Sequence, residues 1–201
     1  NQGFQQDASF TLTDDGLKKA GKKAYVIPLA GNHPPIGALG YVDCAQEIID
    51  HGQKFDAIIT ASGSGTTHSG LLAGFRALGD ETRLFGICVR RNKESQHQRV
   101  LKKARVVSDM INSNFQIESK DINLSDETLL PGYGHLNDEV KEAIELGAQM
   151  EGLMFDPVYT GKALAGLIKL IRSGVFSEKE SLLFIHTGGT PALFGYPSLV
   201  E

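Results

Sequence analysis

A run of glycines and hydroxyl side chains over residues 63–67 has the composition of a site that holds an anion. It follows Ile58 and Ile59, which indicate a buried strand, and it precedes an apolar helical pattern that we expect to begin near Ser69. Glycines let the backbone approach a ligand, hydroxyls can cap the helix, and the free N–H groups of a helix start favour phosphate. An ordinary capped turn has the same composition. The candidate phosphate contacts are Gly63, Ser64, Gly65, Thr66 and Thr67.

Three familiar motifs are excluded by residues in and around this segment. In a Walker loop Gly70 would be followed by lysine, but a leucine stands there. A dinucleotide fingerprint would need a glycine in place of His68, and a nucleophile elbow around Ser64 would need glycines in place of Ser62 and Thr66. We therefore expect a phosphorylated metabolite or a monophosphate cofactor such as pyridoxal phosphate. A phosphosugar would need a further basic contact, and the sequence shows none near this segment.

The composition fits one large α/β domain, since the chain has 201 residues, of which 41% are hydrophobic and 22% charged. The sequence shows no basic, apolar leader and no membrane-length apolar stretch, so we expect a cytoplasmic protein without membrane contact. A net charge of −4 gives no reason to expect nucleic acid, and Arg90, Arg91 and Lys93 are interpreted as solvated loop ends. Cys44 and Cys88 lie in apolar patterns, which indicates small core residues rather than a disulfide, and no metal site is predicted.

Short apolar runs alternate with amphipathic segments along the chain, a pattern typical of an α/β fold. We expect a mostly parallel, twisted sheet with helices on both faces over residues 24–201, after an irregular or truncated edge over residues 1–23. Ligands of such sheets bind at the carboxyl ends of the strands, where polar turns occur over residues 62–67, 159–160 and 187–190. The expected strands are residues 24–28, 58–59, 83–89, 153–155 and 182–186, and the expected helices lie within residues 41–49, 69–75, 92–115, 140–148 and 164–171.

Three longer motifs, together with the turn at residues 63–67, resemble those of a known group of pyridoxal-phosphate enzymes. The motifs are Pro131-Gly132-Tyr133-Gly134-His135, Asp156-Pro157-Val158-Tyr159-Thr160-Gly161-Lys162 and His186-Thr187-Gly188-Gly189-Thr190-Pro191. The group contains the D-cysteine desulfhydrases, the L-cysteate sulfo-lyases and the 1-aminocyclopropane-1-carboxylate deaminases, and the motif order is kept from about Ala24 to Tyr196. The resemblance implies the large cofactor-binding domain of a type II pyridoxal-phosphate fold.

The same resemblance implies a role for each site residue. The turn at residues 63–67 would hold the phosphate of pyridoxal 5'-phosphate, and Tyr133 and Tyr159 would lie over the cofactor as catalytic acids or bases. The substrate would be a small amino acid, and the protein a homodimer. The other residues that the resemblance assigns to the cofactor are Thr160, Thr187 and Gly188.

A threonine stands at position 160, where the deaminases of the group carry a glutamate. A neutral hydroxyl from Thr160 or Thr187 at the pyridine nitrogen leaves that nitrogen largely unprotonated, which disfavours ring opening and favours β-elimination. The resemblance thus implies a lyase that converts D-cysteine to pyruvate, ammonia and hydrogen sulfide. The alternatives are an L-cysteate sulfo-lyase, a 1-aminocyclopropane-1-carboxylate deaminase and an inactive module that binds a phosphate ligand.

The lysine that anchors the cofactor in this group has no counterpart in the sequence. Asn92-Lys93 has the expected dipeptide in a different context, and Lys162 is interpreted as a structural or exposed lysine at a helix start. We therefore expect the small, lysine-bearing domain of the family to lie outside this chain, in a protein of roughly three hundred residues. The chain alone is expected to be inactive in elimination.

Overall fold

The structure is a computed structural model that describes residues 15–23 and 33–199. The chain divides into two compact units, residues 1–33 and residues 34–201. In the first unit residues 15–19 are helical rather than irregular, and the N–H of Gly21 donates to the carbonyl of Lys18 at the end of this helix. The strand expected over residues 24–28 lies outside the described residues. The candidate site lies in the second unit.

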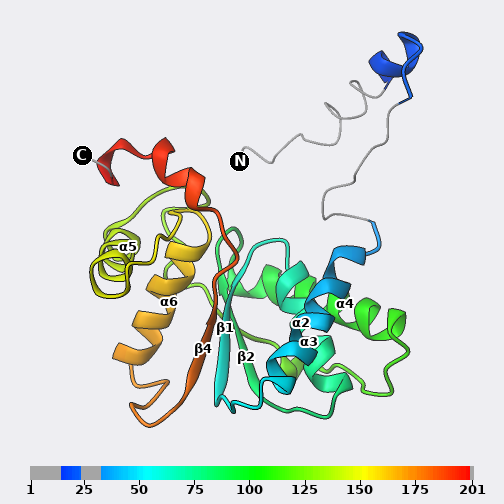
Figure 1. Cartoon of the computed structure of the whole chain (residues 1–201), viewed down its shortest axis with the longest axis horizontal. Coiled ribbons are helices and arrows are strands. Elements are labelled where there is room, and N and C mark those ends of the chain that lie inside the picture. Colours follow the sequence, from blue (N-terminus) through cyan, green and yellow to red (C-terminus); the bar gives the residue numbers. More distant parts are fainter. Residues whose placement is uncertain (1–14, 24–32, 200–201) are drawn as a thin grey trace. The chain divides into compact units, whose positions relative to one another are not determined.

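The described part of the second unit contains a four-stranded sheet in which every pair of neighbours is parallel (Figure 1). Its strand order is β3-β2-β1-β4, so that β1 lies between β2 and β4. The register places Ile58 of β1 beside Leu84 of β2 and Leu183 of β4. The strands are β1 (Ala57–Ser62), β2 (Arg83–Cys88), β3 (Asn123–Ser125) and β4 (Leu182–Ile185).

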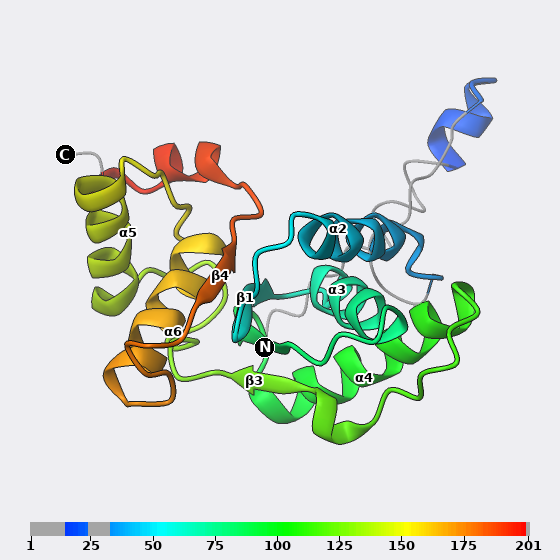
Figure 2. The ribbon, with the colours of Figure 1, turned by 60° about the horizontal axis from the view of Figure 1, so that its bottom comes forward.

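Helices cover both faces of this sheet, as the sequence predicts, and Figure 2 shows the two layers from a second direction. On one face α3 packs against β1 and β2, and α2 and α4 flank α3. On the other face α6 packs against the same strands, and α5 packs on α6. The helices are α2 (Leu39–Asp50), α3 (Thr66–Ala77), α4 (Lys93–Met110), α5 (Asp138–Glu151) and α6 (Thr160–Arg172). Short 3-10 turns span Ile36–Ala38, Ser119–Asp121, Thr190–Gly195 and Pro197–Leu199.

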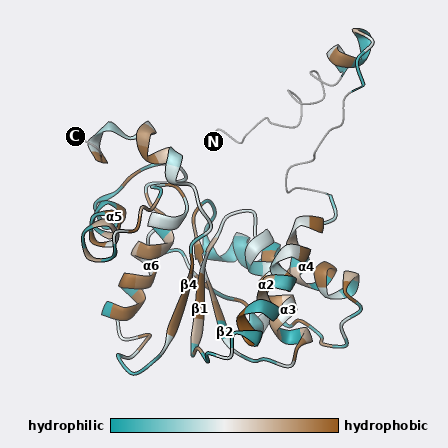
Figure 3. Ribbon diagram, viewed as in Figure 1, coloured by the Kyte–Doolittle hydropathy of each residue, from teal (hydrophilic) through white to brown (hydrophobic). Residues whose placement is uncertain are grey.

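The core follows from the two-residue period of β1, which is buried along its whole length. Ile58 packs with Leu72 and Phe75 on the α3 side, whereas Ile59 packs with Leu167 on the α6 side. Both faces of the strand are therefore apolar, as expected of a parallel strand between two helical layers. Figure 3 shows the hydrophobic colour concentrated on the strands and on the helix faces turned toward them.

Most expected elements are confirmed, and three details differ. Helix α4 begins after Asn92, whose side chain accepts the N–H of Ser95 at 3.1 Å, but it ends at Met110 rather than at residue 115. The strand expected over residues 153–155 is wrong, since this segment belongs to no strand, and the short strand β3 was not expected. Both cysteines are free, Cys88 buried and Cys44 only partly so. In the described part of the chain, no helix is both long and apolar enough to cross a membrane.

Candidate cofactor site

The strand order places a switch point between β1 and β4. The chain adds β2 and β3 on one side of β1 and then places β4 on the other side. Loops that leave neighbouring strands in opposite directions open a crevice at the carboxyl ends, where ligands of such sheets bind. A cavity of about 350 Å³ lies there. Its lining residues are Tyr41, Ala61, Gly63, Ser64, Gly65, Thr66, Thr67, Tyr159, Thr187, Gly188 and Gly189.

The turn after β1 forms one end of this cavity. Gly65 adopts a left-handed conformation with φ of 80° immediately before α3, which begins at Thr66 rather than near Ser69. The N-cap residue is Gly65, which has no side chain to cap the helix. The Ser64 hydroxyl accepts the N–H of Thr66 at 3.2 Å and donates to its hydroxyl at 3.1 Å. The N–H groups of Ser64, Gly65 and Thr67 have no acceptor among the described residues. These N–H groups and the dipole of α3 suit an anion.

Basic side chains support the turn from behind, which corrects the expectation that none is near it. Lys103 of α4 donates from Nζ to the carbonyl of Ser64 at 2.8 Å and to the hydroxyl of Thr66 at 3.1 Å. Arg99 donates to the same carbonyl at 3.0 Å, and Arg91 donates to the carbonyl of Gly63 at 3.1 Å. Arg91 is therefore part of the site and not a solvated loop end. The four-residue spacing of Arg99 and Lys103 placed both on one helix face, but nothing in the sequence showed which loop that face meets.

The positive charges of these side chains lower one another's pKa values. Burial, followed by the positive charges of Arg99 and Arg91, lowers the pKa of Lys103 to about 8. Burial also lowers the pKa of Arg91, again helped by its cationic neighbours. The back of the turn is thus a region of positive potential that a bound dianion would relieve.

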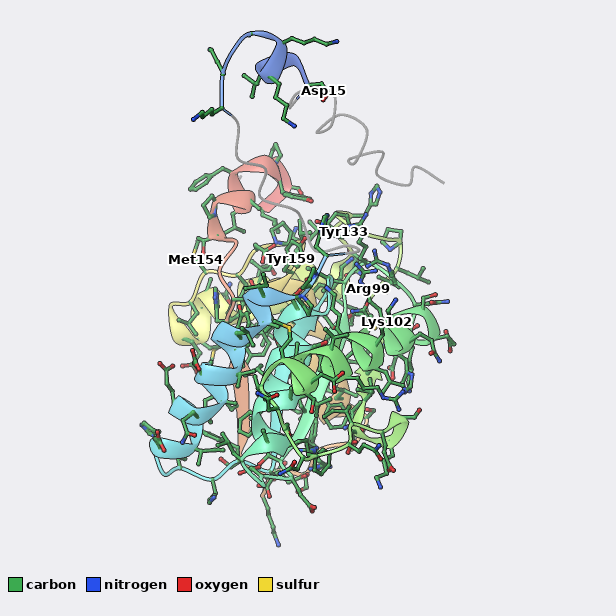
Figure 4. All side chains as sticks on the ribbon, turned by 90° about the vertical axis from the view of Figure 1, so that its right-hand side faces the viewer. Asp15, Arg99, Lys102, Tyr133, Met154 and Tyr159 are labelled. Atoms are coloured by element: carbon green, nitrogen blue, oxygen red, sulfur yellow. The ribbon has the colours of Figure 1, made fainter. Side chains whose placement is uncertain are left out.

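A pair of tyrosines forms a wall beside the turn, and Figure 4 shows Tyr133 and Tyr159 close together. Their hydroxyl oxygens are 2.5 Å apart, and their rings meet edge to face with centroids separated by 5.8 Å. The guanidinium of Arg90 lies 5.4 Å from the centre of the Tyr133 ring. Burial, followed by the hydrogen bond to Tyr133, raises the pKa of Tyr159 well above its usual value. Tyr159 lines the cavity, whereas Tyr133 does not and contacts Tyr159 through the hydrogen bond between their hydroxyls.

The two threonines predicted at the pyridine nitrogen occupy different places. Thr187 lines the cavity, at the turn after β4. Thr160 is fully buried, and its hydroxyl donates to a carboxylate oxygen of Asp156 at 2.7 Å and accepts the N–H of Asp156 at 3.0 Å. Thr160 therefore lies behind the wall, where it holds the turn that begins α6.

Asp156 organises this wall and was not singled out from the sequence. Its carboxylate accepts the backbone N–H groups of Val158, Tyr159 and Thr160 at 2.9, 2.8 and 2.7 Å. A side chain at Gly189 would bring Cβ to 2.7 Å from the same carboxylate, so the turn after β4 closes over Asp156 only because residue 189 is glycine. The Asp-Pro step before a helix was the available signal, since aspartate accepts the free N–H groups of a helix start.

Lys162 confirms its structural interpretation, although it is buried rather than exposed. Its ammonium donates to the carbonyls of Leu129 and Gly132 at 3.2 and 2.7 Å, which fixes the loop that carries Tyr133. Among the described residues, no lysine lines the cavity.

A buried polar cluster lies beneath the turn. The hydroxyl of Ser62 is 3.3 Å from Nδ1 of His68 and accepts the amide N–H of Gln96 at 2.9 Å. His68 is fully buried, and desolvation lowers its pKa to about 4, so its ring is neutral near pH 7. His68 occupies the position where a dinucleotide fingerprint would need glycine. Its ring packs directly against Gly86, where a Cβ would lie only 2.3 Å from Nδ1 of His68.

The site fits a monophosphate with an aromatic ring. The turn supplies free N–H donors at one end, and the tyrosine pair and Thr187 supply hydroxyls elsewhere in the cavity. Gly63 lies against the ring of Tyr159, since a Cβ there would come within 3.2 Å of it. The volume lies in the range of small-molecule and cofactor sites.

Comparison with known proteins agrees with this geometry: the chain belongs to the pyridoxal-phosphate dependent enzyme family, whose description matches residues 4–188. It is 40% identical over 184 residues to the D-cysteine desulfhydrase of Klebsiella pneumoniae (strain 342), which covers 90% of this chain and 55% of that protein. It is 42% identical over 184 residues to the D-cysteine desulfhydrase of Serratia proteamaculans (strain 568), covering 90% and 54%. The chain thus spans about half the length of these relatives.

Solved structures give the same result. The crystal structure of a 1-aminocyclopropane-1-carboxylate (ACC) deaminase homologue is 34% identical and superimposes with a TM-score of 0.85, covering 98% of this chain and 59% of that one. A pyridoxal 5'-phosphate-dependent aspartate racemase, at 16% identity and a TM-score of 0.55, covers 92% of this chain and 57% of that one and shares the fold alone. The expected family, fold class and cofactor are confirmed.

Proposed function

We propose that the protein is a pyridoxal-phosphate-dependent carbon–sulfur lyase that converts D-cysteine to pyruvate, ammonia and hydrogen sulfide. The observation that carries this proposal is that one cavity contacts the turn at residues 63–67, Thr187 and Tyr159, whose hydroxyl is hydrogen-bonded to that of Tyr133. The two desulfhydrases of similar sequence support the choice of substrate.

Residues of the turn would bind and orient the cofactor. The N–H groups of Ser64, Gly65 and Thr67 would hold its phosphate, because they are free and lie at the positive end of α3. Thr187 would meet the pyridine nitrogen with a neutral hydroxyl. Thr160 would not, because its hydroxyl already donates to Asp156. Bound pyridoxal phosphate supplies the electron-withdrawing group that makes Cα of the substrate acidic.

The tyrosine pair would donate a proton to the leaving group of the substrate. Tyrosine is protonated near pH 7, and the raised pKa of Tyr159 keeps it so at higher pH as well, so its hydroxyl can donate to the sulfur that leaves from Cβ. Tyr133 would hold that hydroxyl in place through the bond between the two oxygens. The base that removes the proton from Cα would be a lysine outside the described residues, in the small domain expected from the family.

An L-cysteate sulfo-lyase is the second candidate, and Arg90 favours it. The guanidinium beside the Tyr133 ring places a positive charge next to the tyrosine pair, where a sulfonate would carry its negative charge. Deamination of 1-aminocyclopropane-1-carboxylate is the weaker alternative, because residue 160 is threonine and not glutamate.

One assay separates these functions. The intact gene product, loaded with pyridoxal phosphate, is mixed in turn with D-cysteine, L-cysteate and 1-aminocyclopropane-1-carboxylate, and sulfide, sulfite, pyruvate and 2-oxobutyrate are measured. We expect sulfide and pyruvate from D-cysteine. Sulfite from L-cysteate alone would favour the second candidate, and cofactor binding without any product would indicate an inactive binding module. The homodimer and the cytoplasmic location are part of the proposal, and light scattering and cell fractionation test them.

A further inference from the structure

The carbonyl of Ser64 receives two cationic donors from outside the cavity. Lys103 Nζ and Arg99 Nε lie 2.8 and 3.0 Å from its oxygen, and both side chains come from α4. Arg91 makes the same kind of contact with the preceding carbonyl, that of Gly63, at 3.1 Å. Three cations thus hold two consecutive peptide groups of one short turn.

The geometry of the peptide bond gives these contacts a direction. In a trans peptide the C=O and the following N–H point to opposite sides. A cation that binds the Ser64 carbonyl therefore orients the Gly65 N–H away from α4, and Arg91 on the Gly63 carbonyl does the same for the Ser64 N–H. Both residues line the cavity and neither N–H has an acceptor among the described residues. A bound cation also polarises the peptide, which strengthens its N–H as a donor.

Two of these cations, Lys103 and Arg91, have no carboxylate partner in the part of the chain that the structure describes. Lys103 is only 8% exposed, and its own partners are a carbonyl and a hydroxyl. A nearly buried ammonium among like charges is costly unless an anion lies close by.

We propose that Lys103 and Arg99 are positioning residues for the cofactor phosphate: they do not touch it, but they fix the Ser64 peptide so that the turn's N–H groups face it. The charge of the pair selects a phosphate monoester over an uncharged analogue of the same ring. This inference rests on the proposed binding of pyridoxal phosphate at residues 63–67. The role of α4 in this inference is indirect, because α4 contributes no residue to the cavity lining.

The test compares two ligands and three substitutions in the intact gene product. Binding of pyridoxal phosphate and of pyridoxal, which lacks the phosphate, is titrated by absorbance for wild type, Lys103→Met, Arg99→Met and Lys102→Met. Lys102 is the matched control, because it is an exposed lysine of the same helix, and Figure 4 shows it beside Arg99 on α4. Thermal unfolding of each cofactor-free variant checks its folding, and the ³¹P resonance of bound pyridoxal phosphate reports on the phosphate surroundings.

We expect Lys103→Met to weaken pyridoxal phosphate binding by about tenfold and Arg99→Met by about threefold, as for lost charge-assisted hydrogen bonds. Affinity for pyridoxal should stay within about twofold of wild type in both variants, and Lys102→Met should change neither ligand. The ³¹P resonance should shift in the first two variants only.

Each other outcome overturns the inference. Equal losses for both ligands would show a general structural role for Lys103, and unchanged phosphate selectivity would show that the cations are irrelevant to the cofactor. If Lys103→Met does not fold, the partly exposed Arg99 still decides through its own ratio of the two affinities. A wild-type protein that binds D-cysteine products or substrates but not pyridoxal phosphate would overturn the proposed function as well, whereas normal binding in all variants would overturn this inference alone.

Discussion

Tyr159 combines exposure to the cavity with a strongly bonded hydroxyl. The hydroxyl is protonated across the neutral range, like that of any tyrosine, and burial and Tyr133 raise its pKa further. We expect Tyr159→Phe to lower kcat for sulfide release by about a hundredfold, the usual contribution of one acid or base. Tyr133→Phe leaves that donor in place and should cost less. Pyruvate formation measures both, and equal kcat for Tyr159→Phe and wild type would exclude the assigned role.

His68 predicts a pH dependence of stability. Its pKa is about 4 in the folded protein against 6.5 for a free histidine, because the buried ring cannot be charged without loss of solvation. The unfolded chain therefore binds more protons between these values, so the free energy of unfolding is full above pH 6.5 and falls as the pH drops toward 4. The expected loss is about 3 kcal/mol.

Urea unfolding at several pH values measures this loss. His68→Asn should be less stable at pH 7 and should lack most of the slope between pH 6.5 and 4. A slope of the same size in His68→Asn and wild type would assign it to other groups.

At the level of residues, the sequence predicted that the turn and the tyrosines belong to the site. The composition of a helix start indicated the turn, and the motifs of the resemblance indicated the tyrosines. The sequence did not predict Lys103 or Asp156. Lys103 meets Ser64 across 39 positions of the chain, and such contacts depend on how α4 lies against α3. The direction of the Thr160 side chain, toward Asp156, also required the structure, because a motif does not contain it.

Among the helices, the seam between α2 and α3 is the closest approach that bears on the site. A Cβ on Gly70 would lie 2.3 Å from the carbonyl oxygen of Ala38 and 2.7 Å from Cβ of Tyr41. Gly70→Ala must therefore push α2 away, together with Tyr41, which lines the cavity. We expect a loss of about 1–3 kcal/mol in stability, as for an overpacked core, and weaker binding of pyridoxal phosphate.

Gly40→Ala is the control for this substitution. Gly40 lies in α2, and a Cβ there would meet nothing within 4 Å. Because alanine favours helices, we expect this change to raise stability by up to about 1 kcal/mol and to leave cofactor binding unchanged. Denaturant unfolding compares the two variants, and equal effects would contradict the close packing of α2 on α3.

The elements themselves were predictable where apolar periodicity is long. Helices α5 and α6 follow from such patterns, and β1 follows from its run of buried apolar residues. The three residues of β3 carry no such signal, since two of them are polar. The wrong strand at residues 153–155 has a physical cause: Phe155 packs its ring over Gly147 of α5, where a Cβ would lie 2.5 Å from the ring, so this segment serves helix packing.

For the whole molecule, cofactor binding should appear as added stability. A ligand that binds only the folded state stabilises it by about 2.7 kcal/mol at one hundred times its Kd. We expect pyridoxal phosphate to raise Tm of the intact gene product and pyridoxal to raise it less at the same concentration, because pyridoxal lacks the phosphate that the N–H groups of the turn would bind. Calorimetry with both ligands measures this difference, and an equal rise would argue against the turn.

The fold as a whole was predictable because apolar runs and amphipathic segments alternate along the chain, a pattern that indicates a mostly parallel sheet. The sequence also placed the candidate site at the carboxyl ends of the strands, from the polar turns there, and the cavity lies at those ends. Which side chains meet there required the structure. Arg90, Arg91 and Arg99 are ordinary surface residues in the sequence, and only packing brings them to one turn and one aromatic wall.

A crystal structure of the intact gene product with pyridoxal phosphate tests the central claim most directly. We predict phosphate oxygens within hydrogen-bond distance of the N–H groups of Ser64, Gly65 and Thr67, with the ring between Tyr159 and Thr187. A phosphate bound elsewhere, or a turn whose N–H groups face away from the ligand, would contradict the account.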